Sequence, residues 1–471
     1  CQRAVTKQVG YPRLARRVNT PCSESNGTKC ALTNRRDNSH STLTANRSQL
    51  HRPCVHATFG LAPATVKKGC RMPPRKTTAM ANPFDPTFDH LIDRHGTGSL
   101  KWDRYRGRDV IPMWVADMDF PAPPCVLDAL HAHVDHGVLG YTLPTAEVTD
   151  AVVSGLESAH DWRIDPDWIV WLPGVVSALN VACRAVGKPG DGVVVEPPIY
   201  PPFMSAPTLS GRKTVSVPLL ETPGGFRHDW DGLADALGPD APLLALCSPH
   251  NPTGRAFSHD ELSRIAALCR ERDAIVCSDE IHCGLVLDPD QPHIPFPVLS
   301  DDAAQRCIVL MAPSKTYNIP GLSCSFAVIP NPELRRSFRS AAQGIVPDVN
   351  ALGFTACAAA YAKGESWHQA LISYLRVNHD LVAAAVADMP FLKATPVEAT
   401  YLAWIDCRQL PVPDPAVFFE ENGVGLSDGQ AFAGPGFLRL NFGCPRPRLT
   451  EALRRMTDAV QELLNGSQTA Q

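Results

Sequence analysis

Short apolar runs alternate along the middle of the chain with longer segments in which apolar residues recur at helical spacing. Five runs are continuous and apolar: GVVVEPP (192–198), PLLALC (242–247), AIVCSD (274–279), CIVLMAP (307–313) and SFAVIP (325–330). Runs of this kind are typical of parallel strands, which are buried on both faces. Between them, residues 175–186 have helical spacing, and residues 258–273 open with Ser258 and Glu261 at capping-box spacing. The alternation predicts an α/β fold with a mostly parallel sheet flanked by helices.

The pattern changes after Pro332, where the segments with helical spacing become longer. Three of them follow one another at 332–344, 350–364 and 366–389. Two strand-like runs with a helical segment between them come next, and an amphipathic helix ends the chain. This order predicts a second, smaller α+β domain.

We therefore expect two domains. Residues 130–365 should form the large domain, while residues 80–129 and 366–471 should be the N-terminal and C-terminal segments of the small one. The proline-rich segment EPPIYPPF (196–203) is expected to be a rigid loop.

Charge is distributed unevenly over the 471 residues, whose formal net charge is −4. Residues 1–80 contain 15 Lys and Arg but 2 Asp and Glu, so the remainder is mildly acidic and gives no reason to expect a nucleic-acid partner. The basic segment fits a transit peptide by composition and a nucleic-acid arm by charge. Because Met80-Ala81-Asn82 resembles a normal start, we favour a third interpretation, upstream sequence outside the native protein. We expect residues 1–79 to be a disordered basic tail.

The cysteines indicate a reducing compartment. Five of the 16 lie in the basic tail without zinc-type spacing, and most of the other eleven lie within apolar runs, as buried free thiols do. Cys277, His282 and Cys283 are close in sequence, but no fourth ligand follows at zinc spacing, so we expect no metal site. No apolar run approaches the roughly 18 residues of a membrane span. We expect a cytoplasmic protein without a membrane segment.

Candidate chemistry gathers at the ends of three predicted strands. Asn251 follows the run at 242–247, Asp279 ends the run at 274–279 and His282 follows it, and Lys315 follows the run at 307–313. Burial lowers the pKa of a lysine and makes its neutral amine available as a nucleophile or base. An amide, an acid, an imidazole and a lysine are what a pyridoxal 5′-phosphate (PLP) site requires, with Lys315 forming the Schiff base and Asp279 pairing with the pyridine nitrogen.

The amino-acid sequences of nine blocks resemble the MalY/PatB branch of carbon–sulfur lyases, the cystathionine β-lyase type, within the fold-type I aminotransferase superfamily. The resemblance runs from about residue 84 to about residue 465. Its blocks are KWDRY (101–105), PMWVADMDFPAPP (112–124), GYT (140–142), PGVVSAL (173–179), EPPIYPPF (196–203), SPHNPTGR (248–255), SDEIH (278–282), HIPF (293–296) and SKTYNIPGL (314–322).

The resemblance implies further cofactor contacts. Asn251 and His282 would bond the ring oxygen of the cofactor, Tyr200 would stack on its ring, and Ser314 would add a hydroxyl. The phosphate would lie at Gly174, Val175 and Val176, where a helix begins.

Many aminotransferases hold the phosphate with an arginine eight residues after the lysine, where this chain has Ser323. The resemblance implies that Tyr141 reaches over from a second subunit to compensate, in a homodimer with shared active sites. Arg439 would hold the substrate carboxylate, and Trp114 and Asp117 would line the substrate side.

The implied reaction is β-elimination on L-cystathionine or a related cysteine S-conjugate, releasing a thiol, pyruvate and ammonia, as in methionine biosynthesis. Lys315 would also be the base that removes the Cα proton. Two alternatives stay open at this point. One is an aminotransferase with the same cofactor residues, and the other is a PLP-binding regulator whose main task is to bind a partner protein.

Overall fold

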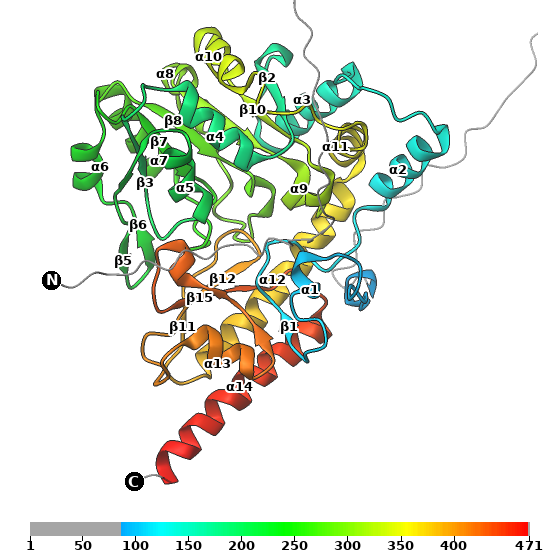
Figure 1. Cartoon of the computed structure of the whole chain (residues 1–471), viewed down its shortest axis with the longest axis vertical. Coiled ribbons are helices and arrows are strands. Elements are labelled where there is room, and N and C mark those ends of the chain that lie inside the picture. The colour runs from blue at the N-terminus through cyan, green and yellow to red at the C-terminus, as the bar shows by residue number, and fades with distance from the viewer. Residues whose placement is uncertain (1–85, 470–471) are drawn as a thin grey trace, which may run out of the picture. The chain divides into compact units, whose positions relative to one another are not determined.

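The computed structural model describes residues 86–469, and its larger lobe is built on a seven-stranded sheet (Figure 1). The strand order is β2-β10-β9-β8-β7-β3-β4. The strands are β2 (Ile169–Leu172), β3 (Gly192–Val195), β4 (Lys213–Ser216), β7 (Leu243–Cys247), β8 (Ile275–Asp279), β9 (Cys307–Met311) and β10 (Ser325–Val328). The predicted α/β class and the mostly parallel sheet are confirmed.

Strand β10 departs from the prediction in its direction. It runs antiparallel to both of its neighbours, β2 and β9, whereas β9, β8, β7, β3 and β4 are parallel to one another. All four residues of β10 are buried. A continuous apolar run indicates that a strand is buried on both faces of its sheet. It does not determine the direction of the strand, and β10 is buried on both faces but antiparallel.

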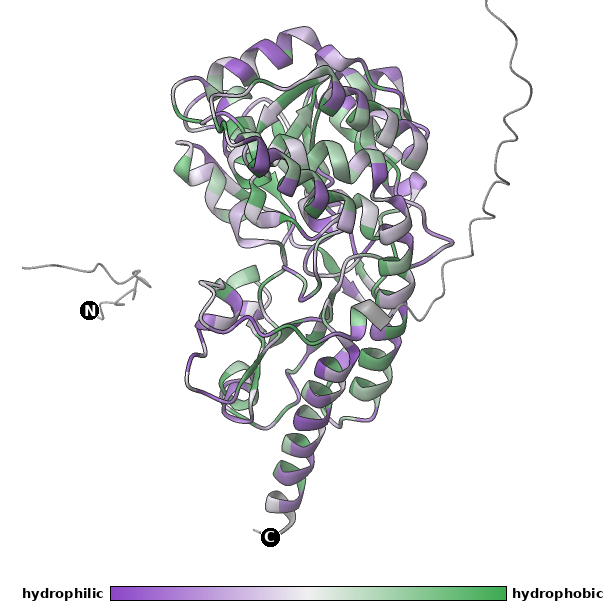
Figure 2. Cartoon of the chain, turned by 90° about the vertical axis from the view of Figure 1, so that its right-hand side faces the viewer, coloured by the Kyte–Doolittle hydropathy of each residue, from purple (hydrophilic) through white to green (hydrophobic). Residues whose placement is uncertain are grey.

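Helices cover both faces of this sheet, and the apolar strands lie between them (Figure 2). One face packs against α4 (Val175–Ala185), α5 (Pro201–Leu209) and α10 (Pro332–Ala342). The other face packs against α3 (Ala146–His160), α6 (Trp230–Ala236), α7 (His259–Glu271), α8 (Asp301–Gln305) and α11 (Ala351–Lys363).

Two local predictions have different outcomes. The capping box is confirmed, because the Ser258 hydroxyl accepts from the Glu261 backbone N–H and the Glu261 carboxylate accepts from the Ser258 backbone N–H. The segment 196–203 is a loop only as far as Tyr200, since α5 begins at Pro201. Proline is tolerated in the first turn of a helix, where its missing N–H costs no hydrogen bond.

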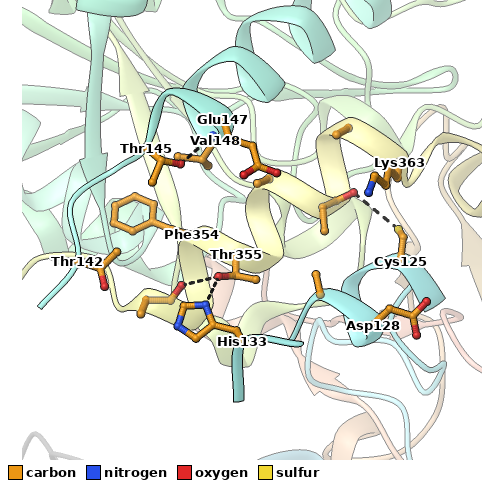
Figure 3. Close-up of a pocket in the computed structure, with 15 residues that line it drawn as sticks. Cys125, Asp128, His133, Thr142, Thr145, Glu147, Val148, Phe354, Thr355 and Lys363 are labelled. Atoms are coloured by element: carbon orange, nitrogen blue, oxygen red, sulfur yellow. Dashed lines mark hydrogen bonds between the residues drawn. The ribbon is translucent and has the colours of Figure 1, made fainter. Parts of the chain in front are cut away.

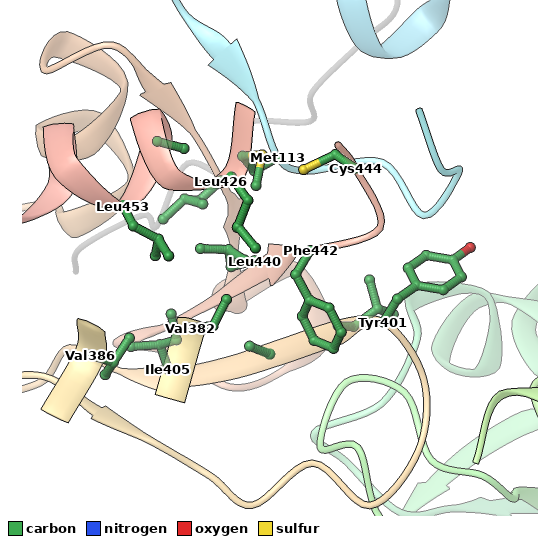
Figure 4. Packing of buried hydrophobic residues seen from close by; sticks show 14 of the residues in the cluster. Met113, Val382, Val386, Tyr401, Ile405, Leu426, Leu440, Phe442, Cys444 and Leu453 are labelled. Carbon is green, nitrogen blue, oxygen red and sulfur yellow. The ribbon is translucent and has the colours of Figure 1, made fainter. Parts of the chain in front are cut away.

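The smaller lobe contains a four-stranded antiparallel sheet in the order β11-β12-β15-β14. These strands are β11 (Lys393–Ala394), β12 (Leu402–Asp406), β14 (Ser427–Asp428) and β15 (Phe437–Asn441). They pack against α12 (Glu365–Ala387), α13 (Pro415–Glu421) and α14 (Arg446–Thr469), and Figure 4 shows part of this core, including Leu440, Phe442 and Leu453.

The beginning of the described chain belongs to the core of this lobe. Strand β1 (Ile111–Pro112) pairs in parallel with β13 (Val424–Gly425), and Met113 is completely buried beside Leu426 and Leu440 (Figure 4). The domain boundaries at residues 129 and 365 stay predictions. The predicted basic tail at 1–79 lies outside the described residues.

Short elements complete the described chain. They are α1 (Leu100–Asp103), α2 (Pro124–His136), α9 (Pro313–Thr316), the hairpin β5 (Leu220–Thr222) and β6 (Gly225–Arg227), and the 3₁₀ turns η1 (Pro86–Asp89), η2 (Pro166–Trp168), η3 (Cys283–Leu285), η4 (Phe296–Leu299), η5 (Pro320–Leu322) and η6 (Gly429–Phe432).

The cysteines of the described chain are unpaired. All eleven within residues 86–469 are free thiols, and nine of them are buried, with Cys125 and Cys283 partly exposed. Burial raises the pKa of most of these thiols, including Cys247 and Cys277. Within the same range, no helix is both long and apolar enough to cross a membrane.

Candidate active site

The ends of strands β7, β8 and β9 meet the smaller lobe at a cavity of about 790 Å³. The described residues that line it include eleven of the predicted site residues: Trp114, Gly174, Val175, Val176, Tyr200, Asn251, Asp279, His282, Ser314, Lys315 and Arg439. They come from segments that are far apart in sequence. Ligands of open α/β sheets bind beyond the carboxyl ends of the strands, which is where these side chains lie.

Lys315 lies in the short helix α9, four residues after β9 ends. Its Nζ donates a hydrogen bond to the backbone oxygen of Ala116 at 2.6 Å. Burial and the positive charge of Arg439 lower the pKa of Lys315 to about 8, against the opposing effect of Asp117 and Asp279. The amine is therefore close to neutral at mildly alkaline pH, as a nucleophile or a base must be.

Asp279 is the last residue of β8 and is 5% exposed. Burial raises the pKa of its carboxyl to about 7, helped by Glu280, although its Oδ1 accepts a hydrogen bond from the Ile281 backbone N–H at 3.1 Å. A buried carboxylate with so little compensation would be stabilised by a cation placed in the cavity beside it.

His282 contributes a neutral imidazole to the same wall. Burial and the charges of Lys315 and Arg439 lower its pKa to about 3. Its Nδ1 is buried and has no hydrogen-bond partner among the described residues. Buried polar atoms are nearly always paired, so this atom indicates a missing partner.

Arg439 lines the cavity from strand β15. Its guanidinium donates to Asn251 Oδ1 at 3.0 Å and to the Trp114 backbone oxygen at 2.8 Å, and lies 4.6 Å from the centre of the Phe432 ring. No carboxylate within residues 86–469 pairs with it, and its Nε has no partner there. Burial lowers its pKa to about 10, so it stays charged at neutral pH. A buried cation of this kind is ready to receive an anionic ligand.

The orientation of Asn251 follows from this contact. Its Oδ1 accepts from Arg439, so its NH₂ group remains to donate elsewhere. The Asn251 backbone oxygen accepts from the Tyr200 N–H at 3.0 Å, which holds the tyrosine beside the amide at the cavity wall.

The N-terminus of α4 also lines the cavity. Gly174 is its N-cap, and within the described chain no side chain caps this end of the helix. The first N–H groups of an α-helix lack intrahelical partners and carry the positive end of its dipole. Gly174, Val175 and Val176 with nearby Ser314 therefore form a place where a phosphate fits.

Two predicted residues do not line the cavity. The Asp117 carboxylate pairs with Arg94 Nη2 at 2.7 Å, although its charge still raises the pKa of Lys315. Tyr141 is fully exposed on the loop between α2 and α3. Tyr141 therefore does not line the cavity of its own chain, and its role in the active site of a second subunit stays a prediction.

Sequence reasoning missed several residues that organise the site. The Tyr401 hydroxyl donates at 2.8 Å to Ala116 O, the oxygen that Lys315 also uses. Asn441 Nδ2 donates to the Asp117 backbone oxygen at 2.7 Å. Asn441 could have been found, because it lies two positions after Arg439 in a strand and so shares its face. The hydrogen bonds of Lys315 and Tyr401 to Ala116 could not have been found in the sequence, since the acceptor is a backbone carbonyl oxygen.

The comparisons with known proteins place the chain in a family. The aminotransferase class I and II family matches residues 108–456. The chain belongs to this family. The predicted resemblance is confirmed as well, since cystathionine β-lyase PatB of Bacillus subtilis is 39% identical over 385 residues, which is 79% of this chain and 99% of PatB.

Two solved structures resemble this member of the aminotransferase class I and II family closely. That of OvoB superposes with a TM-score of 0.77 at 47% identity and covers 79% of this chain and 98% of OvoB. Cystalysin from Treponema denticola, whose structure contains PLP, gives 0.76 at 35% identity and covers 80% of this chain and 99% of cystalysin. Fold type I is therefore confirmed.

The residues present here fit PLP. Asp279 is a buried carboxylate that needs a cation, and the pyridinium nitrogen supplies one. The uncapped start of α4 suits the phosphate, and Lys315 has the lowered pKa that attack on an aldehyde requires.

Proposed function

We propose that this protein is a PLP-dependent carbon–sulfur lyase that carries out β-elimination on cysteine S-conjugates such as L-cystathionine. The observation that carries the proposal is the buried Arg439, a cation without a carboxylate partner in the described chain, in the same cavity as Lys315. This pair suits an α-amino acid whose carboxylate is gripped while its Cα is exposed to a base. The similarity to PatB supports elimination as the outcome.

In this proposal the cofactor supplies one chemical property, a ring that accepts the negative charge left when Cα loses its proton. Asp279, Asn251, His282 and Tyr200, which line the cavity, would hold the ring, and the α4 N-terminus with Ser314 would hold the phosphate. Asp279 as a carboxylate would keep the ring nitrogen protonated, which strengthens the charge acceptance.

The chain's own groups act on the substrate. Arg439 binds the carboxylate through two parallel hydrogen bonds, and Lys315 takes the proton from Cα. The electron pair left at Cα forms the Cα–Cβ double bond as the thiolate leaves Cβ. Water then hydrolyses the released enamine, so that one conjugate and one water give a thiol, pyruvate and ammonia.

Other residues of the same cavity would receive the sulfur substituent. They are Trp114 and Val417 and the charged residues Arg104, Asp414, Glu420 and Asp428. Glu420 is neutralised by Arg108 at 2.7 Å, whereas Asp414 and Asp428 are exposed helix caps whose salt-bridge partners would have to come from outside the described chain. Two arginines, Arg104 and Arg108, stand against three carboxylates here, so the group keeps a net negative charge and favours substituents that carry positive charge or hydrogen-bond donors.

We also propose a homodimer in which Tyr141 completes the partner's active site. The apolar residues Val134, Val138, Leu139 and Leu143 around it are all exposed in the single chain. Beside this loop lies a cavity of about 510 Å³, shown in Figure 3, where Thr142 and Thr145 face Phe354 of α11. A contiguous exposed apolar segment of this kind is typical of an interface.

The predicted cytoplasmic location is part of the proposal. The free thiols within residues 86–469 support a reducing compartment.

The decisive experiment incubates the PLP-loaded protein with L-cystathionine and, separately, with a common amino donor and 2-oxoglutarate. Release of thiol and pyruvate in equal amounts, with little glutamate, is expected. Rapid glutamate formation without thiol release would show that the protein is an aminotransferase instead. A panel of cysteine conjugates with different substituents then identifies the preferred leaving group.

A further inference from the structure

The amine of Lys315 is held by a backbone oxygen from a distant part of the chain. Ala116 O lies 2.6 Å from Lys315 Nζ, although the two residues are 199 positions apart. Ala116 belongs to residues 113–120, which follow β1 and form neither helix nor strand. Such a segment needs side-chain contacts to keep its carbonyl oxygen in place.

Asn318 supplies three of these contacts through one side chain. Its Oδ1 accepts from the Met118 backbone N–H at 2.9 Å, and its Nδ2 donates to the Met118 oxygen at 3.0 Å and the Phe120 oxygen at 2.8 Å. Both the donor and the acceptor of the amide are used. No other residue type of similar size has both groups in this arrangement.

Asn318 lies three residues after Lys315 in the same turn and has a φ of 52°. Asparagine tolerates this left-handed region better than most residues. The chain from Lys315 to Asn318, the Asn318–Met118 hydrogen bonds, the chain from Met118 to Ala116 and the Ala116–Lys315 hydrogen bond together form a closed ring. The ring fixes the distance between the amine and the oxygen that holds it.

We propose that Asn318 is a positioning residue for Lys315, acting through the Ala116 carbonyl; this inference rests on the proposed function. A neutral amine that donates one N–H to Ala116 O must direct its lone pair elsewhere. With the oxygen fixed, one N–H direction is set, and the lone pair is confined to the two remaining positions on the nitrogen when the amine takes the Cα proton. The same oxygen also accepts from the Tyr401 hydroxyl at 2.8 Å.

The test uses a reaction step that precedes elimination. The PLP-loaded protein is incubated in D₂O with L-alanine, which has no leaving group, and NMR follows exchange of the Cα proton. Asn318→Gly keeps the left-handed backbone accessible but removes all three hydrogen bonds. We expect its maximal exchange rate to fall about 10- to 100-fold with half-saturation changed less than about twofold, since a displacement of about 1 Å can cost about 100-fold in rate.

Asn331→Ala is the matched control. Asn331 also uses both groups of its amide, since its Oδ1 accepts from the backbone N–H groups of Glu333 and Leu334 at 2.9 and 3.2 Å and its Nδ2 donates to the Gln305 oxygen at 3.1 Å, but these bonds cap helix α10 and do not involve residues 113–120. It should lose thermal stability and keep the exchange rate. Should Asn318→Gly not fold, Asn318→Asp keeps the acceptor and loses the donor, and is expected to slow exchange in the same way.

The inference is overturned if either Asn318 variant exchanges as fast as wild type, or if rate and half-saturation change in the Asn331→Ala variant as they do in Asn318→Gly. Failure of the proposed function looks different. In that case the wild-type protein would exchange the alanine proton and yet release no thiol from any cysteine conjugate.

Discussion

Removal of the Arg439 guanidinium is the most informative perturbation of this site. In the Arg439→Ala variant the substrate carboxylate enters a desolvated pocket with no cation to meet it. The pocket also loses the donor that holds Asn251 Oδ1 at 3.0 Å and the Trp114 oxygen at 2.8 Å. The cofactor contacts of Asp279 and Lys315 come from β8 and α9 and should remain.

The size of the effect follows from the geometry. Arg439 has no carboxylate partner among residues 86–469, so the substrate meets a charge that is not already neutralised. Removing one partner of a buried, hydrogen-bonded charge pair costs about 2–5 kcal/mol. At about 1.4 kcal/mol for each factor of ten, kcat/KM should fall by between about 30-fold and about 4,000-fold. Arg439→Lys keeps the charge but loses the two-pronged geometry, and should lie between wild type and Arg439→Ala.

Pyruvate release from L-cystathionine measures kcat/KM, and the visible absorbance of the bound cofactor measures its retention. Arg408→Ala is the control, since Arg408 also lies against an aromatic ring, that of Phe437, but already pairs with Asp406 at 2.7 Å outside the cavity. It should retain wild-type kinetics. A kcat/KM for Arg439→Ala within about threefold of wild type would refute the assignment of Arg439 to the substrate carboxylate. The assignment would also be refuted if the variant were inactive because it no longer retained the cofactor.

Four further predictions test other parts of the site. Borohydride treatment of the PLP-loaded protein should leave the cofactor covalently attached to Lys315, and peptide mapping that finds the label on another lysine would contradict this. In the cofactor-free protein, the pKa of Asp279 is raised from 3.8 to about 7, so its contribution to stability is lost as the pH rises through about 7. Between pH 5.5 and 7.5, denaturant unfolding should therefore show wild type losing about 2 kcal/mol relative to Asp279→Asn, and parallel pH profiles would argue against the burial of a protonated carboxyl. Mixing Tyr141→Ala and Lys315→Ala proteins under subunit exchange should restore up to about a quarter of the wild-type sites, while no recovery would mean that Tyr141 acts within its own subunit. Conjugates with a cationic sulfur substituent should react about 2- to 10-fold faster than anionic ones at low salt, a preference that high salt or the double variant Asp414→Asn/Asp428→Asn should remove.

The sequence was sufficient for those parts of the site whose chemistry lies in side chains at strand ends. Asn251, Asp279 and Lys315 follow apolar runs, and a parallel sheet brings the ends of such runs to one edge, so their meeting was predictable. The direction of β10 was not predictable, because a strand that is buried on both faces, as Ser325–Val328 is, has the same apolar sequence pattern whether it runs parallel or antiparallel.

Other features depend on tertiary geometry alone. Trp114 was predicted from its block and lines the cavity, whereas Asp117 of the same block turns away to Arg94. The Ala116 oxygen belongs to the backbone, which every sequence provides at every position. Only the folded chain shows that this one carbonyl lies beside the amine of Lys315.

The buried thiols have a consequence for a protein that works on sulfur compounds. Cys247 lines the cavity, and burial holds the pKa of its thiol well above 9.0. A thiol attacks a disulfide as its thiolate, so a protonated Cys247 exchanges slowly even with a disulfide brought directly against it. A disulfide-containing amino acid such as cystine, once bound in this cavity, would therefore become attached to its wall only slowly. The burial that packs the sheet would in this way also protect the cavity from modification by a disulfide substrate.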